Sequence, residues 1–206
     1  MAKKLFITGI DTSVGKTIAA AIICQSLGAD YWKPIQAGDV EKGDKHTVQL
    51  LLSNPDCQIH PNSFALQSAM SPHAAAQIDK VVIESNNIIA PKTSNHLVIE
   101  GAGGLLVPLN ETETMLDLIK ADYQVIVVSR HYLGSINHSL MTIKLLQQRG
   151  FKVSLIFNGE ENPATEKIIK QMTGIQALGR INQESTVDKH MIKKYAKQFN
   201  LALQQL

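Results

Sequence analysis

Residues 9–17 read GIDTSVGKT and connect a short apolar run, residues 5–7, to a helix-like stretch over residues 18–27. A glycine-rich loop between a strand and a helix is typical of a phosphate-binding loop, whose backbone N–H groups surround nucleotide phosphates. Lys16 is then placed to reach the β- and γ-phosphates, and the Thr17 hydroxyl to bind Mg²⁺. The spacing is one residue longer than the common GxxxxGK(S/T) pattern, so the flanking strand and helix carry the prediction. A purely structural glycine turn is the alternative.

Composition indicates one globular domain over residues 1–206. The chain has 44% hydrophobic and 18% charged residues and no low-complexity tract, a balance typical of a folded domain with a sizeable core. Its formal net charge of +2 gives no electrostatic argument for nucleic acid, whose binders concentrate basic residues on one face. Lysines near the C-terminus alternate with apolar residues at helical spacing and are predicted to form a solvated helix face; they are Lys189, Lys193, Lys194 and Lys197.

Cysteine content and hydropathy both favour the cytoplasm. The two cysteines, Cys24 and Cys57, form neither a disulfide framework nor a metal-ligand spacing. The apolar run after the N-terminal lysines is too short for a secretory signal, and no stretch approaches the ~18 apolar residues of a membrane span. We therefore expect a cytoplasmic protein without a membrane partner.

Apolar runs alternate with helical patterns along the chain, which is the signature of a parallel sheet covered by helices. Strands are predicted at residues 4–10, 96–100, 124–129 and 152–158, with weaker ones at 30–33 and 176–181. Helices are predicted at residues 16–27, 44–52, 114–121, 136–149, 164–172 and 187–199. Residues 53–95 carry four prolines and are expected to form loops and short helices rather than a second domain. The predicted fold class is α/β, a mostly parallel sheet flanked by helices, as in P-loop NTPases.

Polar residues lie where several predicted strands end, and in open α/β sheets ligands gather at that edge. Glu100 is a candidate second Mg²⁺ ligand, with an ordinary strand-end glutamate as the alternative. Lys33 is either a second cation for the transferring phosphoryl group or a surface lysine, and Asp44 is either a metal ligand or only a helix N-cap. Residues 101–104, GAGG, lack the third glycine of a dinucleotide fingerprint. They are expected to let the backbone approach phosphate or substrate closely.

Six motifs, taken in order and spacing, resemble the dethiobiotin synthase family. They are TGIDTSVGKT at 8–17, WKP at 32–34, SPH at 71–73, VIEGAGG at 98–104, GSINH at 134–138 and FN at 157–158. The resemblance runs from the N-terminus to about residue 182. It implies a seven-stranded, mostly parallel P-loop sheet and a homodimer.

The resemblance also implies a reaction of biotin biosynthesis. Similar enzymes use ATP and Mg²⁺ to join 7,8-diaminononanoate and CO₂, supplied as bicarbonate, into the ureido ring of dethiobiotin, and they release ADP and phosphate. One amine is carbamylated, the carbamate oxygen attacks the γ-phosphorus, and the second amine displaces phosphate from the carbamic-phosphoric anhydride. Catalysis of this kind depends on positioning and charge neutralisation.

The resemblance implies a role for each residue that stands at a matching position of the family motifs. The implied catalytic residues are Lys16, Lys33 and Thr12. The implied nucleotide contacts are Ser13, Val14, Gly15, Lys16, Thr17, Glu100, Gly103 and Asn158, the last of which reads adenine. The implied Mg²⁺ ligands are Thr17, Asp44 and Glu100. Substrate would contact Thr12 and Lys33 of one subunit and a turn from the partner subunit, made of Leu133, Gly134, Ser135, Ile136 and Asn137.

Some of these residues also have a purely structural interpretation, and the sequence differs from the family pattern at three positions. From the sequence alone, Asn137 is favoured as a helix cap and Asn158 as a turn residue. His73 is as readily a core or capping histidine as a chemical group. Ser13 and Ala37 replace the glutamate and serine that the family often has. Asn182 replaces a proline in the adenine loop, which predicts a looser nucleotide preference.

Two other enzyme classes share the lengthened phosphate loop. A partitioning-type ATPase switch carries a lysine where this chain has Asp11, and that lysine acts across a dimer, so its absence argues against this class. Amidoligases that form cobyrinate or CTP add a glutaminase domain, for which 206 residues leave no room.

Overall fold

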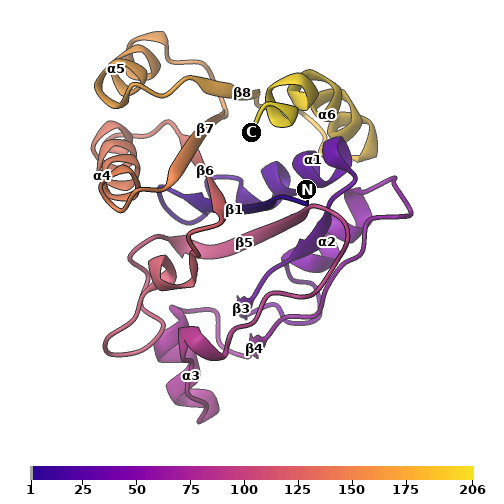
Figure 1. Ribbon diagram of the computed structural model, residues 1–206, viewed down its shortest axis with the longest axis vertical. Coiled ribbons are helices and arrows are strands. Elements are labelled where there is room, and N and C mark those ends of the chain that lie inside the picture. Colours follow the sequence, from indigo (N-terminus) through magenta and orange to yellow (C-terminus); the bar gives the residue numbers. More distant parts are fainter. Residues whose placement is uncertain (1) are drawn as a thin grey trace.

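A six-stranded parallel sheet forms the centre of the molecule (Figure 1). The computed structural model describes residues 2–206. The strands, in spatial order, are β2 (Asp30–Trp32), β5 (Leu97–Gly104), β1 (Lys4–Gly9), β6 (Tyr123–Arg130), β7 (Lys152–Asn158) and β8 (Ala177–Ile181). Every neighbouring pair is parallel. The carboxyl ends of all six strands therefore lie at one edge, and the predicted fold class is confirmed.

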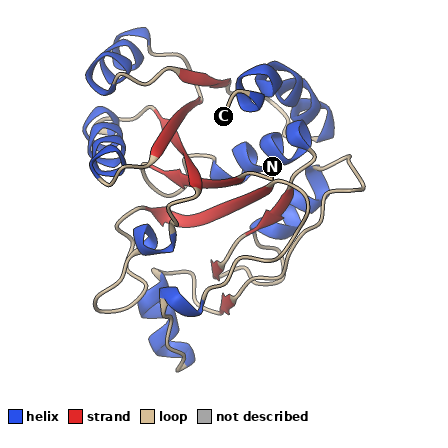
Figure 2. Ribbon diagram, in the orientation of Figure 1, coloured by secondary structure: helices blue, strands red, loops and turns tan. Residues whose placement is uncertain are grey.

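Burial on both faces explains why the strands read as continuous apolar runs. Leu5, Phe6 and Ile7 of β1 and residues 125–128 of β6 have no exposed surface. Figure 2 shows helices grouped on both sides of the strands. The first group is α4 (Ser135–Gln148) and α5 (Pro163–Thr173), and the second is α1 (Lys16–Leu27), α2 (Asp44–Leu51) and α6 (Lys189–Gln204).

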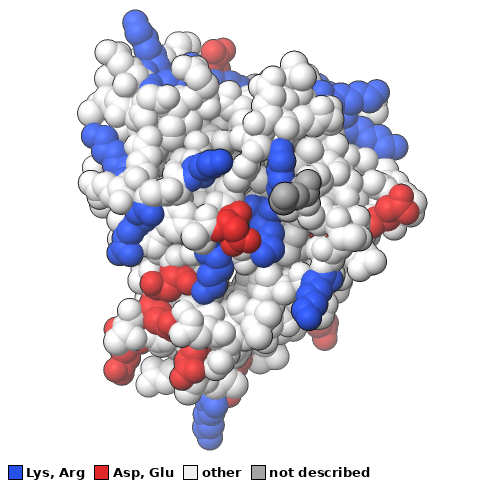
Figure 3. Space-filling model, viewed as in Figure 1, with Lys and Arg blue, Asp and Glu red and all other residues white. Residues whose placement is uncertain are grey.

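The basic C-terminal helix behaves as its pattern predicts. The Asp188 carboxylate caps α6 by accepting the Met191 N–H at 2.8 Å. Ile192, Tyr195 and Phe199 are buried against the rest of the protein, whereas the four lysines of the pattern are exposed. On the face drawn in Figure 3, Lys and Arg side chains are scattered among Asp and Glu.

Three elements differ from the sequence-based expectation. The main sheet has six strands rather than seven, because the chain after Pro34 leaves it and forms a separate two-stranded parallel sheet of β3 (Ile35–Ala37) and β4 (Phe64–Leu66). The strand predicted at 96–100 continues as β5 to Gly104. The helix predicted at 114–121 is only a 3₁₀ turn, η2 (Met115–Leu118), because the backbone N–H groups of Asp117 and Ile119 bond three residues back, to Thr114 and Leu116, and not four.

Residues 53–95 form loops and short elements, as predicted. Besides β4 they contain α3 (Pro72–Asp79) and a single 3₁₀ turn, η1 (Ser85–Asn87). Within residues 2–206, no helix combines the length and apolar character needed to cross a membrane.

Candidate functional site

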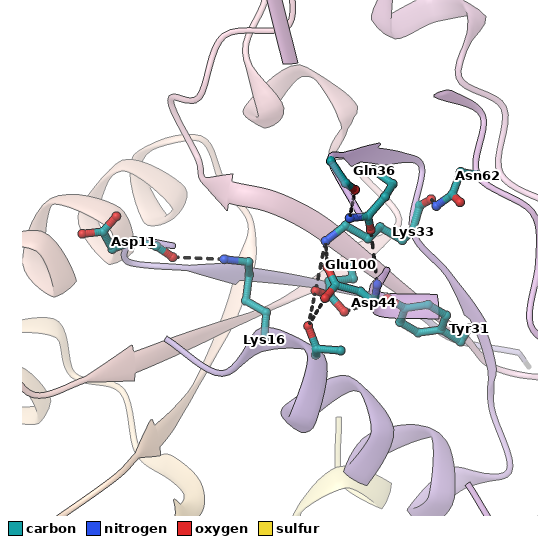
Figure 4. Close-up of polar contacts among 10 residues, drawn as sticks. Asp11, Lys16, Tyr31, Lys33, Gln36, Asp44, Asn62 and Glu100 are labelled. Atoms are coloured by element: carbon teal, nitrogen blue, oxygen red, sulfur yellow. Dashed lines mark hydrogen bonds and ion pairs between the residues drawn. The ribbon is translucent and has the colours of Figure 1, made fainter. Parts of the chain in front are cut away.

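The loop between β1 and α1 folds back over the end of its own strand. A side chain at Gly9 would bring a Cβ within 2.5 Å of the Asp11 carbonyl oxygen, so only glycine fits there. Gly15 has a φ of +95° where the loop enters α1, again a conformation that favours glycine. Lys16 begins the helix, and its Nζ donates to the Asp11 carbonyl at 3.0 Å across the loop (Figure 4).

Lys16 is placed to respond to an anion. Its side chain is buried, and this burial lowers the pKa of Lys16 to about 8, although the nearby Glu100 carboxylate opposes the shift. An ammonium in a poorly solvated site gains most from a new negative charge beside it. A phosphate group held by the loop would provide that charge.

Four polar side chains from four different segments meet beside the loop, as Figure 4 shows for Lys33, Asp44 and Glu100. The Thr17 hydroxyl lies 3.0 Å from Asp44 Oδ1 and 2.9 Å from Glu100 Oε1. Lys33 Nζ donates to Asp44 Oδ2 and, at 3.3 Å, to Glu100 Oε1. The parallel sheet explains this convergence, because Lys33, Glu100 and the loop all follow or lie near the carboxyl ends of adjacent strands.

The charges in this cluster stabilise one another. Burial alone would lower the pKa of Lys33, but the Glu100 and Asp44 carboxylates raise it above its ordinary value. Burial would likewise raise the pKa of Asp44, and the Lys33 ammonium instead holds it below the ordinary value. The Lys33 ammonium thus joins two carboxylates that would otherwise repel each other.

The donor set fits Mg²⁺. A hydroxyl has one proton, so Thr17 donates to only one of the two carboxylate oxygens that it contacts. Its lone pairs and the oxygens of Asp44 and Glu100 are the hard ligands that Mg²⁺ prefers. No group of three or more His, Cys, Asp or Glu side chains suited to a metal occurs within residues 2–206. Mg²⁺ sites typically take one or two protein carboxylates, and phosphate and water complete the coordination shell.

A cavity of about 790 Å³ opens in front of the cluster. Nine of the predicted site residues line it; they are Thr12, Ser13, Gly15, Lys16, Thr17, Lys33, Asp44, Glu100 and Gly103. Ser71, Pro72 and Ala37 also line the cavity, whereas His73 does not and is exposed on α3. The methyl group of Ala37 offers no hydrogen bond at a position where the family often has serine.

Asn158 lies behind the loop rather than in this cavity. Its Nδ2 donates to the Val14 carbonyl at 2.8 Å, and a Cβ at Gly15 would come within 2.2 Å of the same Nδ2. Asn158 also lines a separate crevice of about 270 Å³, together with Arg130, Asn162 and Gln183. The structure therefore connects Asn158 to the nucleotide loop from the side opposite Lys33.

The turn at 133–137 does not reach the cavity of its own chain. Gly134 has a φ of +101° and begins α4. Leu133 is fully exposed, and Ile136 is 37% exposed, whereas Ser135 is buried. Within a single chain, the residues predicted to bind the substrate carboxylate are therefore separate from Lys16 and Lys33.

Comparison with known proteins places the chain in a family. A family model described as an AAA domain matches residues 3–191. The ATP-dependent dethiobiotin synthetase BioD of Christiangramia forsetii is 52% identical over 204 residues, covering 98% of this chain and 99% of that protein. The enzyme of the same name from Cytophaga hutchinsonii is 47% identical over 197 residues, covering 94% and 95%. The chain belongs to the dethiobiotin synthetase family.

Solved structures of low identity share the fold of this dethiobiotin synthetase family member. A putative plasmid partition protein from Borrelia burgdorferi, bound to AMPPNP, has a TM-score of 0.64 at 13% identity, covering 100% of this chain and 99% of that one. A ParA family ATPase from Chlorobium tepidum has a TM-score of 0.59 at 14% identity, covering 95% and 98%. These likenesses show the fold alone, so they add nothing to the partitioning alternative.

Two side chains of this family member support the cluster without having been predicted. The Tyr31 hydroxyl donates to Glu100 Oε2 at 2.8 Å. Gln36 Oε1 accepts the Asp44 backbone N–H at 3.3 Å, while its Nε2 donates to the Gly38 carbonyl at 2.9 Å. A signal for Tyr31 was present in the sequence, since it lies two residues before Lys33 and so on the same face of a strand. Gln36 gave no such signal.

Proposed function

We propose that this chain carries out the ATP-dependent synthesis of dethiobiotin for which its relatives are named. The observation that carries the proposal is the convergence of Thr17, Lys33, Asp44 and Glu100 beside Lys16 at one cavity. A phosphate loop, a Mg²⁺ donor set and a second buried lysine are what phosphoryl transfer to a carbamate requires. Membership of the dethiobiotin synthetase family supports diaminononanoate and CO₂ as the other reactants.

The proposed reaction has three steps. An amine of diaminononanoate attacks CO₂ and loses a proton, which forms a carbamate. A carbamate oxygen then attacks the γ-phosphorus of ATP, and ADP leaves. The second amine finally attacks the carbonyl carbon and loses a proton, phosphate leaves, and the ureido ring closes. Negative charge develops on carbamate and phosphoryl oxygens at each stage, so positioned cations account for much of the expected rate enhancement.

The residues that line the cavity would act on different parts of the reacting groups, according to their positions. Lys16 would neutralise charge on the β- and γ-phosphates, and Lys33, on the opposite wall, charge on the carbamate. The Thr12 backbone N–H already donates to Asp11 Oδ1 at 2.7 Å, which leaves the Thr12 hydroxyl for phosphate or carbamate oxygens. Thr17, Asp44 and Glu100 would hold Mg²⁺, which when bound supplies further positive charge at the phosphates. Ser13, Gly15 and Gly103 would contact the nucleotide from the same cavity.

We further propose that the working unit is a homodimer. An apolar groove of about 710 Å³ runs along α4 from His138 to Gln148, and Leu106, Met141 and Leu145 are among its lining residues. Leu106 and Met141 are both 59% exposed, which is unusual for large apolar side chains that cover no partner. A second copy seated on this groove would bring its 133–137 turn toward the first copy's cavity. The turn would then bind the carboxylate of diaminononanoate at a helix N-terminus. The expected cytoplasmic location stays a prediction.

Phosphate release is the experiment that tests the function. We expect release from ATP to depend on both diaminononanoate and bicarbonate, with dethiobiotin formed in equal amount by mass spectrometry. Release that is unchanged when diamine and bicarbonate are omitted would instead favour an ATPase switch. Release with diamine but without dethiobiotin would contradict ring closure.

Replacing either carboxylate should raise the Mg²⁺ requirement. Asp44→Asn and Glu100→Gln each remove a negative oxygen ligand of a hard cation. We expect the Mg²⁺ concentration for half-maximal rate to rise by about 100-fold, the upper range for losing support of a metal site. Titration of activity against Mg²⁺ measures this. Asp122→Asn is the control, because Asp122 pairs with Lys4 on the exposed surface, and unchanged curves for both cavity variants would reject the metal role.

Asn158→Ala should reduce the preference for ATP over GTP or CTP, measured as the ratio of their kcat/KM values. If Asn158 reads the base, losing its hydrogen bonds reduces discrimination. Because Asn158 also supports the loop through Val14, kcat/KM is measured for all three nucleotides. A role in loop support alone would lower the three values by the same factor. Asn200→Ala, which removes another amide-to-carbonyl bond far from the loop, controls for general destabilisation.

Mixed dimers should recover activity from two inactive parents. Lys16→Ala and Asn137→Ala chains are allowed to exchange subunits, which makes about half of the dimers mixed, each with one intact composite site. We therefore expect roughly a quarter of all sites to work. Each variant mixed with itself is the control. If native mass spectrometry shows exchange and activity stays absent, Asn137 does not act on the partner's site. A role as the helix cap is already excluded, because Gly134 is the N-cap of α4.

A further inference from the structure

Tyr31 is a fully buried tyrosine whose hydroxyl faces the carboxylate cluster. Its side chain has no exposed surface, and within residues 2–206 the hydroxyl makes one hydrogen bond, to Glu100 Oε2 at 2.8 Å (Figure 4). A buried hydroxyl without a partner is costly, as is a buried carboxylate oxygen without a donor. The bond therefore satisfies both groups at once.

The two oxygens of Glu100 have different partners. Oε2 accepts from Tyr31, and Oε1 accepts from Thr17 at 2.9 Å and from Lys33 at 3.3 Å. Thr17 and Lys33 line the cavity, and Tyr31 does not. Tyr31 thus holds one oxygen on the core side, which leaves the other directed at the groups around the proposed metal.

Strand geometry explains how Tyr31 and Lys33 reach the same carboxylate. Side chains two residues apart in an extended chain lie on the same face. Tyr31 lies within β2, and Lys33 directly follows its last residue, Trp32. β2 pairs in parallel with β5 through Tyr31 and Val98 and then Trp32 and Ile99. Glu100 is the next residue of β5, so it lies between the ends of these two side chains.

We propose that Tyr31 is a positioning residue that orients the Glu100 carboxylate for Mg²⁺. The inference rests on the metal role of Glu100 in the proposed function. Without the hydroxyl, Oε2 loses the donor that holds it on the core side, and the carboxylate can rotate. That rotation moves Oε1 away from Thr17 and Lys33. Groups that orient a metal ligand typically change metal affinity 10- to 100-fold.

The test measures metal binding directly, without nucleotide, diamine or turnover. Mn²⁺ alone is the probe, because carboxylate and hydroxyl oxygens suit it as they suit Mg²⁺, and the loss of the free Mn²⁺ signal in electron paramagnetic resonance reports binding. We expect Tyr31→Phe to weaken Mn²⁺ binding by about 10-fold, at the lower end of the range for outer groups. Tyr123→Phe is the matched control. Tyr123 is also buried, but it begins β6 and so lies at the amino ends of the strands, away from the cavity at their carboxyl ends.

A double-substitution cycle separates positioning from a structural role. If Tyr31 acts through Glu100, Tyr31→Phe should cost nothing further in a Glu100→Gln background, whereas independent effects would add. Circular dichroism and thermal unfolding of every variant establish that each is folded. Should Tyr31→Phe not fold, Tyr31→His, which retains a ring N–H donor, is titrated in the same way and must bind Mn²⁺ more tightly than Glu100→Gln.

The outcomes distinguish the proposed metal site from the proposed positioning role of Tyr31. Mn²⁺ affinity that is unchanged in Glu100→Gln overturns the metal site itself. Weakened binding in Glu100→Gln, with affinity in a folded Tyr31→Phe within twofold of the parent, overturns only the role of Tyr31. Additive losses in the double variant would assign Tyr31 to general structure.

Discussion

Lys16→Ala should remove turnover while the protein stays folded. The lysine contributes charge at the phosphates, and loss of one such positioned donor costs about 10²–10³ in kcat. The only hydrogen bond that its side chain makes within residues 2–206 goes to the Asp11 carbonyl, and burial already disfavours its charged form. Replacing it therefore removes a costly buried cation rather than a packing contact. Phosphate release and thermal unfolding together measure the two halves of this prediction.

Lys167→Ala is the matched control for Lys16→Ala. Lys167 is an exposed residue of α5, so its loss should leave both activity and melting temperature unchanged. A well-folded Lys16→Ala protein that retains its activity would contradict the assignment of residues 9–17 as the phosphate loop.

Lys33→Met should cause the largest loss of stability. Lys33 is 5% exposed and Glu100 1% exposed, so the substitution leaves a buried carboxylate without its cation. Breaking a buried pair in this way typically costs about 3–5 kcal/mol. Asp44 is partly solvated, so most of the cost comes from Glu100. Urea unfolding without ligands gives the free energy of unfolding, and we expect turnover to be lost as well.

The double variant Lys33→Met with Glu100→Gln tests the cause. Neutralising both partners removes the unpaired charge, so this variant should be more stable than Lys33→Met alone. An apolar replacement of Lys33 that leaves the free energy of unfolding unchanged would show that the pair is better hydrated than its burial indicates.

Much of the sheet was predictable because its strands are buried on both faces. Continuous apolar runs identified β1, β5, β6 and β7 within a few residues. Elements whose backbone hydrogen bonds are non-local were not predictable in this way. The segment at 114–121 has a helical pattern, yet its first N–H groups bond to the chain at 105–107. The departure of β3 from the main sheet likewise depends on its distant partner β4.

The site residues likewise include some that a local motif predicts and others whose contacts depend on distant parts of the chain. Lys16 and Thr17 belong to one local motif, and that motif predicted their place. Glu100 was a good candidate from its place at a strand end, whereas a surface lysine explains Lys33 equally well and a helix cap explains Asp44 better. Their mutual contacts depend on the order of the strands in the sheet, which local pattern does not report. The contact of Asn158 with Val14 joins residues 144 apart in the chain, and no spacing rule reports it.

That contact bears on how the protein is made. During synthesis the phosphate loop leaves the ribosome among the first residues, whereas the amide that supports it from behind arrives only with the end of β7. Until then the Val14 carbonyl lacks this donor, and β6 lacks its neighbour on that side. Contacts between distant residues form late because long loops must close first. A nascent chain that ends before residue 158 should therefore bind nucleotide weakly, and tight binding should begin only once β7 has been added.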